Sequence, residues 1–180
     1  MALKSLRGKG WKAAIRDIER KAREGAHTRV GYLEGETSEN DASLPLAQVA
    51  AWNEFGTKTA PARPFMRDTV ANHKGEWAEK LAGIIKEYGY NTHQALDAMG
   101  AVIERQMGDQ IAEGNYTKNS DITNLLKYRF PLNDYSTEDF LKAVRDVKNG
   151  KRAPEGTPLV WSGQLKNNIH HDVKDGPADD

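Results

Sequence analysis

Apolar residues recur at helical spacing in three long stretches of the chain. Residues 10–24 place their apolar side chains on one stripe, which ends at a glycine. Residues 64–88 and 91–114 carry longer stripes, and Asn91 with Gln94 matches the start of a capping box. Because only a few residues join the last two stretches, they are predicted to form an antiparallel helical hairpin.

Shorter patterns predict a small sheet and one further helix. Residues 27–33 alternate imperfectly and predict a strand, and residues 167–173 predict a second strand that pairs with the first. Residues 44–55 predict a short helix whose inward side chains are Leu46, Val49, Ala50 and either Trp52 or Asn53. The polar stretch 34–43, EGETSENDAS, is predicted to be a solvated loop. The fold class is therefore α+β, a small antiparallel sheet packed with long helices.

The segment 115–156 differs in composition and is interpreted as a polar insertion in a single domain of residues 1–180. It is rich in Asn, Lys and Asp, and one helix is predicted in it, over residues 136–148. Ser136 is its predicted N-cap, with Asp139 at the third position. PLVWSGQL then returns the chain to the main fold as a turn or short helix, and residues 174–180 are predicted to be a flexible acidic tail.

Composition narrows the classes of function. The 180 residues contain 26 Lys and Arg against 26 Asp and Glu, and the mean hydropathy is −0.76. A net charge of zero disfavours nucleic-acid binding through bulk charge. The absence of cysteine excludes disulfides, thiolate metal sites and a cysteine nucleophile. MALKSLRGKGWK lacks the apolar core of a signal peptide, and no run is long enough for a membrane helix, so we expect a protein made in a cytoplasm.

Candidate chemistry is sparse, and neither an enzyme, a cofactor nor a metal is expected. Ser162-Gly163 lacks the G-x-S-x-G pattern of a nucleophile elbow. Glu54 is the only acid in a strongly specified context, and a single acid does not make a mechanism. On a strand, His170 and Asp172 share one face, but two ligands are too few for a metal site.

The most strongly specified segment is AAWNEFGTKTAPARPFMRDT, residues 50–69. Gly56 follows a predicted helix and is expected in a left-handed conformation, and Pro64 suits the first turn of the next helix. Arg63 is a poor capping residue, so the free N–H groups of that helix need another acceptor. Thr57, Thr59 and the carboxylate of Glu54 are the candidates.

This corner has two interpretations. It orients two helices, or it forms a contact between identical subunits, because arginines and aromatic residues are enriched at interfaces. Under the second interpretation, the predicted interface residues are Trp52, Asn53, Glu54, Phe55, Arg63, Phe65, Met66 and Arg67.

VAAWNEFGTKTAPARPFMRDTV resembles the signature of a family of tail-completion, or neck, proteins of tailed bacteriophages. RVGYLEG before it and TPLVWSGQLKNNI after it are similar to the family's first strand and to its later turn and strand. The resemblance covers residues 10–114 and 157–173, and 115–156 departs from it. It implies an α+β virion protein that forms a ring, usually of six copies, at the head–tail junction. The implied partners are further copies, head-completion or connector proteins, the tail tube protein and the DNA that passes through.

Two alternatives stay open. The chain is a tail terminator or minor tail component, or it is a DNA-binding module that uses a basic N-terminal arm. The arm consists of Lys4, Arg7, Lys9 and Lys12. These residues are also candidates for contact with a neighbouring ring or with DNA.

Overall fold

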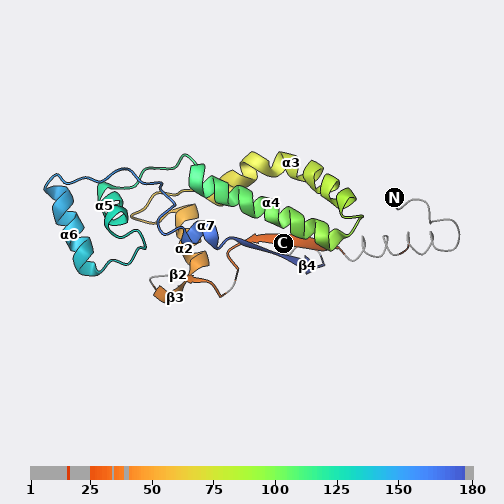
Figure 1. Cartoon of the computed structure of the whole chain (residues 1–180), viewed down its shortest axis with the longest axis horizontal. Coiled ribbons are helices and arrows are strands. Elements are labelled where there is room, and N and C mark those ends of the chain that lie inside the picture. Colours follow the sequence, from red (N-terminus) through yellow and green to blue (C-terminus); the bar gives the residue numbers. More distant parts are fainter. Residues whose placement is uncertain (1–15, 17–24, 34, 39–40, 177–180) are drawn as a thin grey trace. The chain divides into compact units, whose positions relative to one another are not determined.

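The computed structural model describes Arg16 and residues 25–33, 35–38 and 41–176 (Figure 1). The predicted helix over 10–24, apart from Arg16, lies outside the described residues, as do the basic arm and residues 177–180 of the predicted tail. The chain divides into two compact units. The first contains residues 1–30, 75–103 and 171–180, and the second contains residues 31–74 and 104–170.

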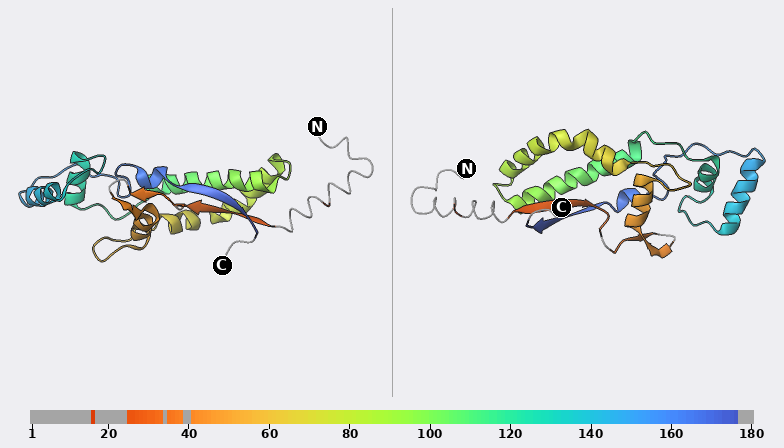
Figure 2. Two further views of the ribbon diagram at one scale, coloured as in Figure 1. Left: turned by 90° about the horizontal axis from the view of Figure 1, so that it is seen from below. Right: turned by 180° about the vertical axis from the view of Figure 1, so that it is seen from behind.

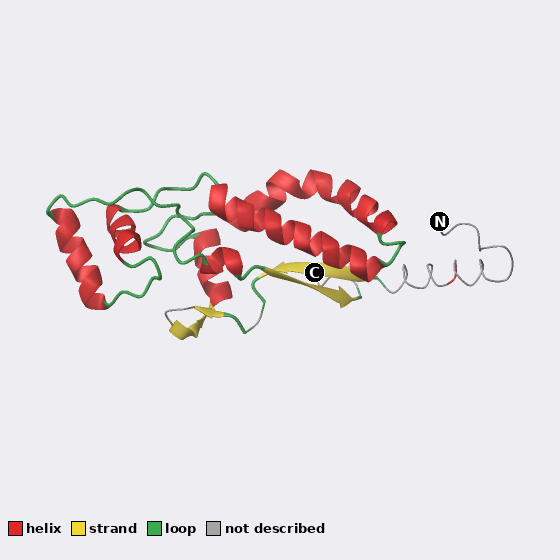
Figure 3. Cartoon of the chain, in the orientation of Figure 1, coloured by secondary structure: helices red, strands yellow, loops and turns green. Residues whose placement is uncertain are grey.

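The predicted α+β class is confirmed. In the described part of the chain there are six helices and two small two-stranded antiparallel sheets (Figure 3). The helices are α2 (Leu46–Phe55), α3 (Phe65–Glu87), α4 (Thr92–Glu113), α5 (Asp121–Arg129), α6 (Thr137–Lys148) and α7 (Gln164–Asn167). The strands are β1 (Ala26–Gly31), β2 (Thr37–Ser38), β3 (Asp41–Pro45) and β4 (His170–Asp175).

Helices α3 and α4 form the predicted antiparallel hairpin, and each contributes to both units. The N–H of Gln94 donates to Oδ1 of Asn91 at 3.2 Å, which confirms Asn91 as the cap of α4. In the second unit, Nδ2 of Asn72 on α3 donates to Oε1 of Gln110 on α4 at 3.1 Å. A short turn and a capped start therefore both favour the hairpin.

The first unit pairs the first and last strands, as predicted. β1 and β4 form one sheet, and the N–H of Gly176 donates to the carbonyl of Gly25 at 3.2 Å. The first turns of α4 lie beside this sheet (Figure 2). A Cβ on Gly100 of α4 would lie 2.5 Å from Cδ2 of His171 and 2.8 Å from Oγ1 of Thr28. The close approach of helix and sheet therefore depends on a glycine at this position.

The second unit has a buried apolar core around the start of α3. Phe65 is fully buried, and its ring meets that of Tyr32 edge-on with centroids 6.3 Å apart. The hydroxyl of Tyr32 donates to the carbonyl of Leu165 at 2.6 Å, and burial raises the pKa of Tyr32. The other large fully buried side chains of this core include Leu46, Ile111 and Ile169.

The predicted solvated loop over 34–43 is wrong, because this segment contributes to a second small sheet. β2 and β3 pair antiparallel, with Thr37 opposite Pro45. The N–H of Leu46, at the start of α2, donates to the carbonyl of Glu36 at 2.9 Å. Backbone hydrogen bonds, rather than apolar side chains, specify this hairpin, so a hydrophobic pattern could not predict it.

The insertion contains two helices rather than the single predicted one. The capping box of Ser136 and Asp139 at the start of α6 is confirmed. The missed helix, α5, is capped by Ser120, whose hydroxyl accepts from the N–H of Thr123 at 3.1 Å. The two helices pack around a small core formed by Leu125, Leu126 and Ala143, with Phe130, Tyr135, Val147 and Trp161 against it. None of the described helices meets the length and hydropathy needed to cross a membrane.

Candidate functional site at the corner between α2 and α3

Helix α2 ends at Phe55, and Gly56 turns the chain with φ of 78°. A Cβ at Gly56 would lie 2.8 Å from the backbone nitrogen of Ala62, so this position requires glycine. The next turn closes on Thr57, whose Oγ1 accepts from the N–H of Ala60 at 3.0 Å. The threonine therefore organises its own turn and does not cap α3, which removes one of the predicted acceptors.

The carboxylate of Glu54 caps α3, as the sequence suggested. Oε2 accepts from the N–H of Met66 at 2.9 Å, and Oε1 accepts from the N–H of Arg67 at 3.1 Å. Glu54 as a whole is only 2% exposed. A negative charge at a helix N-terminus is favoured by the helix dipole and satisfies N–H groups that have no partner within the helix. The last turn of α2 is thereby fixed to the first turn of α3.

Arg67 completes this clamp from the solvent side. Its Nε donates to Oε1 of Glu54 at 2.8 Å, and its Nη2 donates to the backbone carbonyl of the same residue at 2.7 Å. Its guanidinium lies 5.2 Å from the centroid of the Phe55 ring, within the range of a cation–π contact. The clamp holds an exposed arginine and an exposed aromatic ring against each other.

Arg63 makes different contacts. Its Nε donates to the carbonyl of Thr117 at 3.1 Å, and its Nη2 donates to Oδ1 of Asn119 at 3.3 Å. Both acceptors belong to the insertion, so Arg63 connects the corner to that segment. Burial lowers the pKa of Arg63, and no ion pair joins it to any acid of the described residues.

The predicted interface residues differ in their exposure, and their role in a subunit contact stays a prediction. Glu54 and Phe65 are buried within the chain. Of the two alternatives for a further inward position, Asn53 is half-buried, whereas Trp52 is 44% exposed. The inward positions of α2 are Leu46, Ala50 and Glu54, which are spaced four residues apart.

The remaining predicted residues divide into exposed and half-buried positions. Phe55 is 71% exposed, and it lies three residues after Trp52, on the same side of α2. We call the exposed set of Trp52, Phe55 and Arg67 the corner face. Met66 and Asn53 are half-buried, and Nδ2 of Asn53 donates to the carbonyl of Val49 at 2.9 Å.

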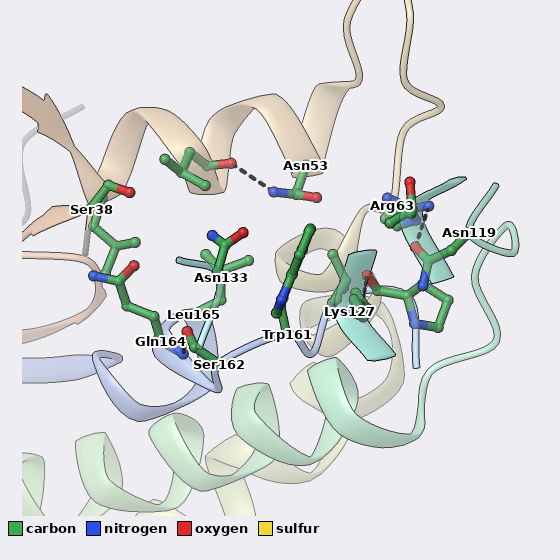
Figure 4. A pocket seen from close by; sticks show the side chains of 15 residues that line it. Ser38, Asn53, Arg63, Asn119, Lys127, Asn133, Trp161, Ser162, Gln164 and Leu165 are labelled. Carbon is green, nitrogen blue, oxygen red and sulfur yellow. Dashed lines mark hydrogen bonds between the residues drawn. The ribbon is translucent and has the colours of Figure 1, made fainter. Parts of the chain in front are cut away.

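A pocket of about 230 Å³ adjoins the corner, and sequence reasoning missed it (Figure 4). It is lined from α2, the corner, the insertion and the segment before α7, and its lining includes Asn53, Arg63, Lys127 and Trp161. These residues are far apart in the sequence, so no local motif indicates the pocket. The signal that the sequence did offer is that Arg63 and Lys127 each lack a nearby Asp or Glu in the sequence.

Lys127 is held tightly at this pocket. Its Nζ donates to the backbone carbonyls of Thr157 at 2.7 Å and Val160 at 2.6 Å, and it lies 5.8 Å from the centroid of the Trp161 ring. Burial, with the nearby charge of Arg63, lowers the pKa of Lys127 to about 8. The backbone carbonyls of residues 157–160, where the chain leaves the insertion, therefore surround a half-buried ammonium.

Comparisons of the chain with protein-family models, curated proteins and solved structures find no match. In the part of the chain that the structure describes, no three His, Asp or Glu side chains are grouped to hold a metal ion. Asp172 of the predicted His170–Asp172 pair instead accepts from Nη2 of Arg29 at 2.8 Å and lies 3.1 Å from Nζ of Lys174. The basic arm of Lys4, Arg7, Lys9 and Lys12 lies outside the described residues.

Proposed function

We propose that this chain is a structural virion protein of a tailed bacteriophage. Copies form a ring, hexameric by the family resemblance, at the head–tail junction. The ring completes the tail and joins it to the capsid connector, and it leaves a channel through which DNA passes without sequence-specific contact. The role is one of assembly and not of catalysis, and its partners are further copies, head-completion or connector proteins and the tail tube protein.

The observation that carries this proposal is the clamp at the corner, in the segment that carries the resemblance. Glu54 is buried and makes hydrogen bonds to the first turn of α3, while Phe55 and Arg67 on the same clamp are exposed. A surface held in one conformation before binding loses less entropy on association. The corner thus resembles a preformed interface more than a simple turn between two helices.

The chemistry of the corner face also supports association. Tryptophan and arginine are among the residue types most enriched at binding hot spots, and phenylalanine is enriched at interfaces in general. Burial of one large apolar side chain contributes about 1.5–3 kcal/mol, so Trp52 and Phe55 together supply a substantial share of a subunit contact. Zero net charge gives little repulsion between copies.

Sedimentation velocity over a range of concentrations, with negative-stain imaging, tests the proposal. We expect association into closed rings, and we expect Phe55→Ser to weaken it by at least about tenfold because an apolar contact is lost. Tyr128→Ser is the matched control, since Tyr128 is 70% exposed and Phe55 is 71% exposed. Equal effects of the two substitutions contradict a role of the corner face.

Deletion of the gene separates the proposed role from its alternatives. Full heads and finished tails that fail to join support a neck protein. Tails of uncontrolled length instead support a tail terminator. A monomer that shifts DNA in a salt-sensitive manner supports the DNA-binding module, because counterion release makes such binding depend on salt.

A further inference from the structure

The pocket beside the corner has a positive charge that no acid in its wall compensates. Arg63 and Lys127 both line it, and the rest of the lining consists of amides, hydroxyls and apolar groups, with no Asp or Glu (Figure 4). All of these residues belong to the second unit. Buried or half-buried cations are normally paired, so this arrangement requires an explanation.

The contacts of Lys127 already account for its own burial. Its ammonium has three N–H donors, and it lies within hydrogen-bond distance of the carbonyls of Thr157, Pro158 and Val160. These neutral acceptors fix the ammonium in place, but they do not cancel its charge. Lys127 therefore adds positive potential to the pocket and has no donor left for a ligand.

Arg63 is different, because much of its hydrogen-bonding capacity is unused. A guanidinium has about five N–H donors. The contacts with Thr117 and Asn119 use Nε and Nη2 only, and both acceptors are neutral. The side chain is anchored on one edge, as in a bidentate site for a carboxylate or phosphate.

Asn133 and Trp161 also line the pocket. Asn133 lines the pocket in a left-handed conformation, with φ of 62°, and its side chain makes no hydrogen bond within the described residues. The indole N–H of Trp161 donates to the carbonyl of Phe130 at 2.7 Å, and its ring, which stacks on Tyr135, contributes apolar atoms to the lining. A ligand with one oxyanion and a small body would match these walls.

We propose that this pocket binds a small oxyanion, a phosphate or carboxylate group, with Arg63 as its principal ligand. The positive potential of Lys127 attracts the anion, and the body attached to it lies near Trp161. This inference goes beyond the proposed function and is independent of it, because it concerns the single chain and does not require a ring.

Titration of the isotope-labelled chain, followed by NMR, tests the inference. The probes are inorganic phosphate, acetate and benzoate, at constant ionic strength set with sodium chloride. We expect at least one probe to give saturable shifts at the side chains of Arg63 and Asn133 and at the indole of Trp161, with a Kd of about millimolar for so small a ligand. Saturation by phosphate alone assigns the site to phosphate groups, and saturation by acetate or benzoate alone assigns it to carboxylates.

Substitutions distinguish a built site from a general charge effect. Arg63→Gln should raise the Kd by at least about tenfold, because a charge-assisted hydrogen bond is lost. Arg105→Gln is the control, since Arg105 is also a cation of the second unit but lies outside this pocket, where its side chain is 83% exposed. A Kd unchanged in Arg63→Gln, or raised equally in the control, overturns the inference, as does the absence of saturation with all three probes.

A second variant covers the case in which Arg63→Gln fails to fold. Asn119→Asp keeps the shape of the side chain and the oxygen that accepts from Arg63, and it places a carboxylate on the guanidinium. It also loses the hydrogen bond from Nδ2 of Asn119 to the carbonyl of Gly156. We expect it to reduce anion binding by at least about tenfold, because Arg63 then has an internal counter-ion. Binding as strong as in the parent chain overturns the inference.

Discussion

Oε1 of Glu54 and Nε of Arg67 lie 2.8 Å apart, and the same carboxylate accepts from two backbone N–H groups at the start of α3. One side chain thus caps a helix, forms an ion pair and fixes the corner between two helices. Because Glu54 is buried while Arg67 is largely exposed, the pair joins the core of the second unit to its surface. The corner face depends on this contact for its shape.

Removal of the clamp should destabilise the fold. Glu54→Ala leaves two N–H groups of α3 without their acceptor and removes an ion pair whose carboxylate is buried, so we expect a loss of about 3 kcal/mol in the free energy of unfolding. Glu54→Gln keeps one acceptor oxygen and should lose about half as much. Denaturant unfolding measures both values. Glu79→Ala, at an exposed position on α3, should change stability by less than about 0.5 kcal/mol.

Two glycines of the helical hairpin should respond in opposite directions to alanine. Gly100→Ala places a Cβ against the ring of His171 and the hydroxyl of Thr28, so we expect a loss of about 1–3 kcal/mol from overpacking. Gly83→Ala meets no atom within 4 Å on α3 and should gain up to about 1 kcal/mol of helix propensity. Thermal unfolding compares them, and a stabilising Gly100→Ala would contradict the close packing of α4 on the β1–β4 sheet.

The ion pair of Asp172 should make the β1–β4 sheet sensitive to acid. Hydrogen bonds from Arg29 and Lys174 lower the pKa of Asp172 below its usual value near 3.8. A carboxyl with a lowered pKa stabilises the folded state at neutral pH, and this contribution is lost as pH falls below the unfolded value toward the folded one. Asp172→Asn should therefore be less stable than the parent chain at neutral pH.

The difference in the free energy of unfolding between Asp172→Asn and the parent chain should decrease steadily as the pH falls below about 4. Urea unfolding at a series of pH values measures it. Asp134→Asn, at an exposed position in the insertion, is the control and should track the parent chain throughout. A difference between Asp172→Asn and the parent that stays constant with pH would show that the ion pair contributes nothing through its charge.

Lys127 should also make stability rise with pH, but in the alkaline range. Burial and the charge of Arg63 lower its pKa from 10.5 to about 8, so the unfolded chain binds more protons between these two values. The contribution of Lys127 to stability should consequently rise as pH increases from about 8 to about 10. Lys127→Met should remove this rise, while Lys142→Met, at an exposed site on α6, should keep it. A direct NMR titration of the Lys127 side chain checks the pKa itself.

Local chemistry accounts for what could be predicted from the sequence. The caps at Asn91 and Ser136 and the carboxylate cap at Glu54 follow from side chains a few residues from the groups they satisfy, or from a short and constrained corner. The pairing of β1 with β4 could also be predicted, because the sequence indicated only two strands and each needed a partner.

Features specified by contacts between distant segments could not be predicted. Helix α5 has only nine residues, and its apolar face packs on α6 and on Trp161. So short a helix gives too few repeats for hydrophobic periodicity to indicate it. The β2–β3 hairpin depends on backbone hydrogen bonds within a polar segment. Glu54 lies on the buried side of α2, so Trp52 lies on the exposed side. This is the opposite of the usual arrangement, in which the aromatic residue is buried and the charged residue is exposed.

The most direct test of the proposed assembly is a cryo-electron microscopy reconstruction of a tailed particle that contains this chain. We expect adjacent copies to close into a ring at the head–tail junction, with Trp52 and Phe55 buried against a neighbouring copy and Arg67 in contact with it. A reconstruction in which the chain is present as a single copy, or in which the corner face of every copy is exposed to bulk water, would contradict the proposal.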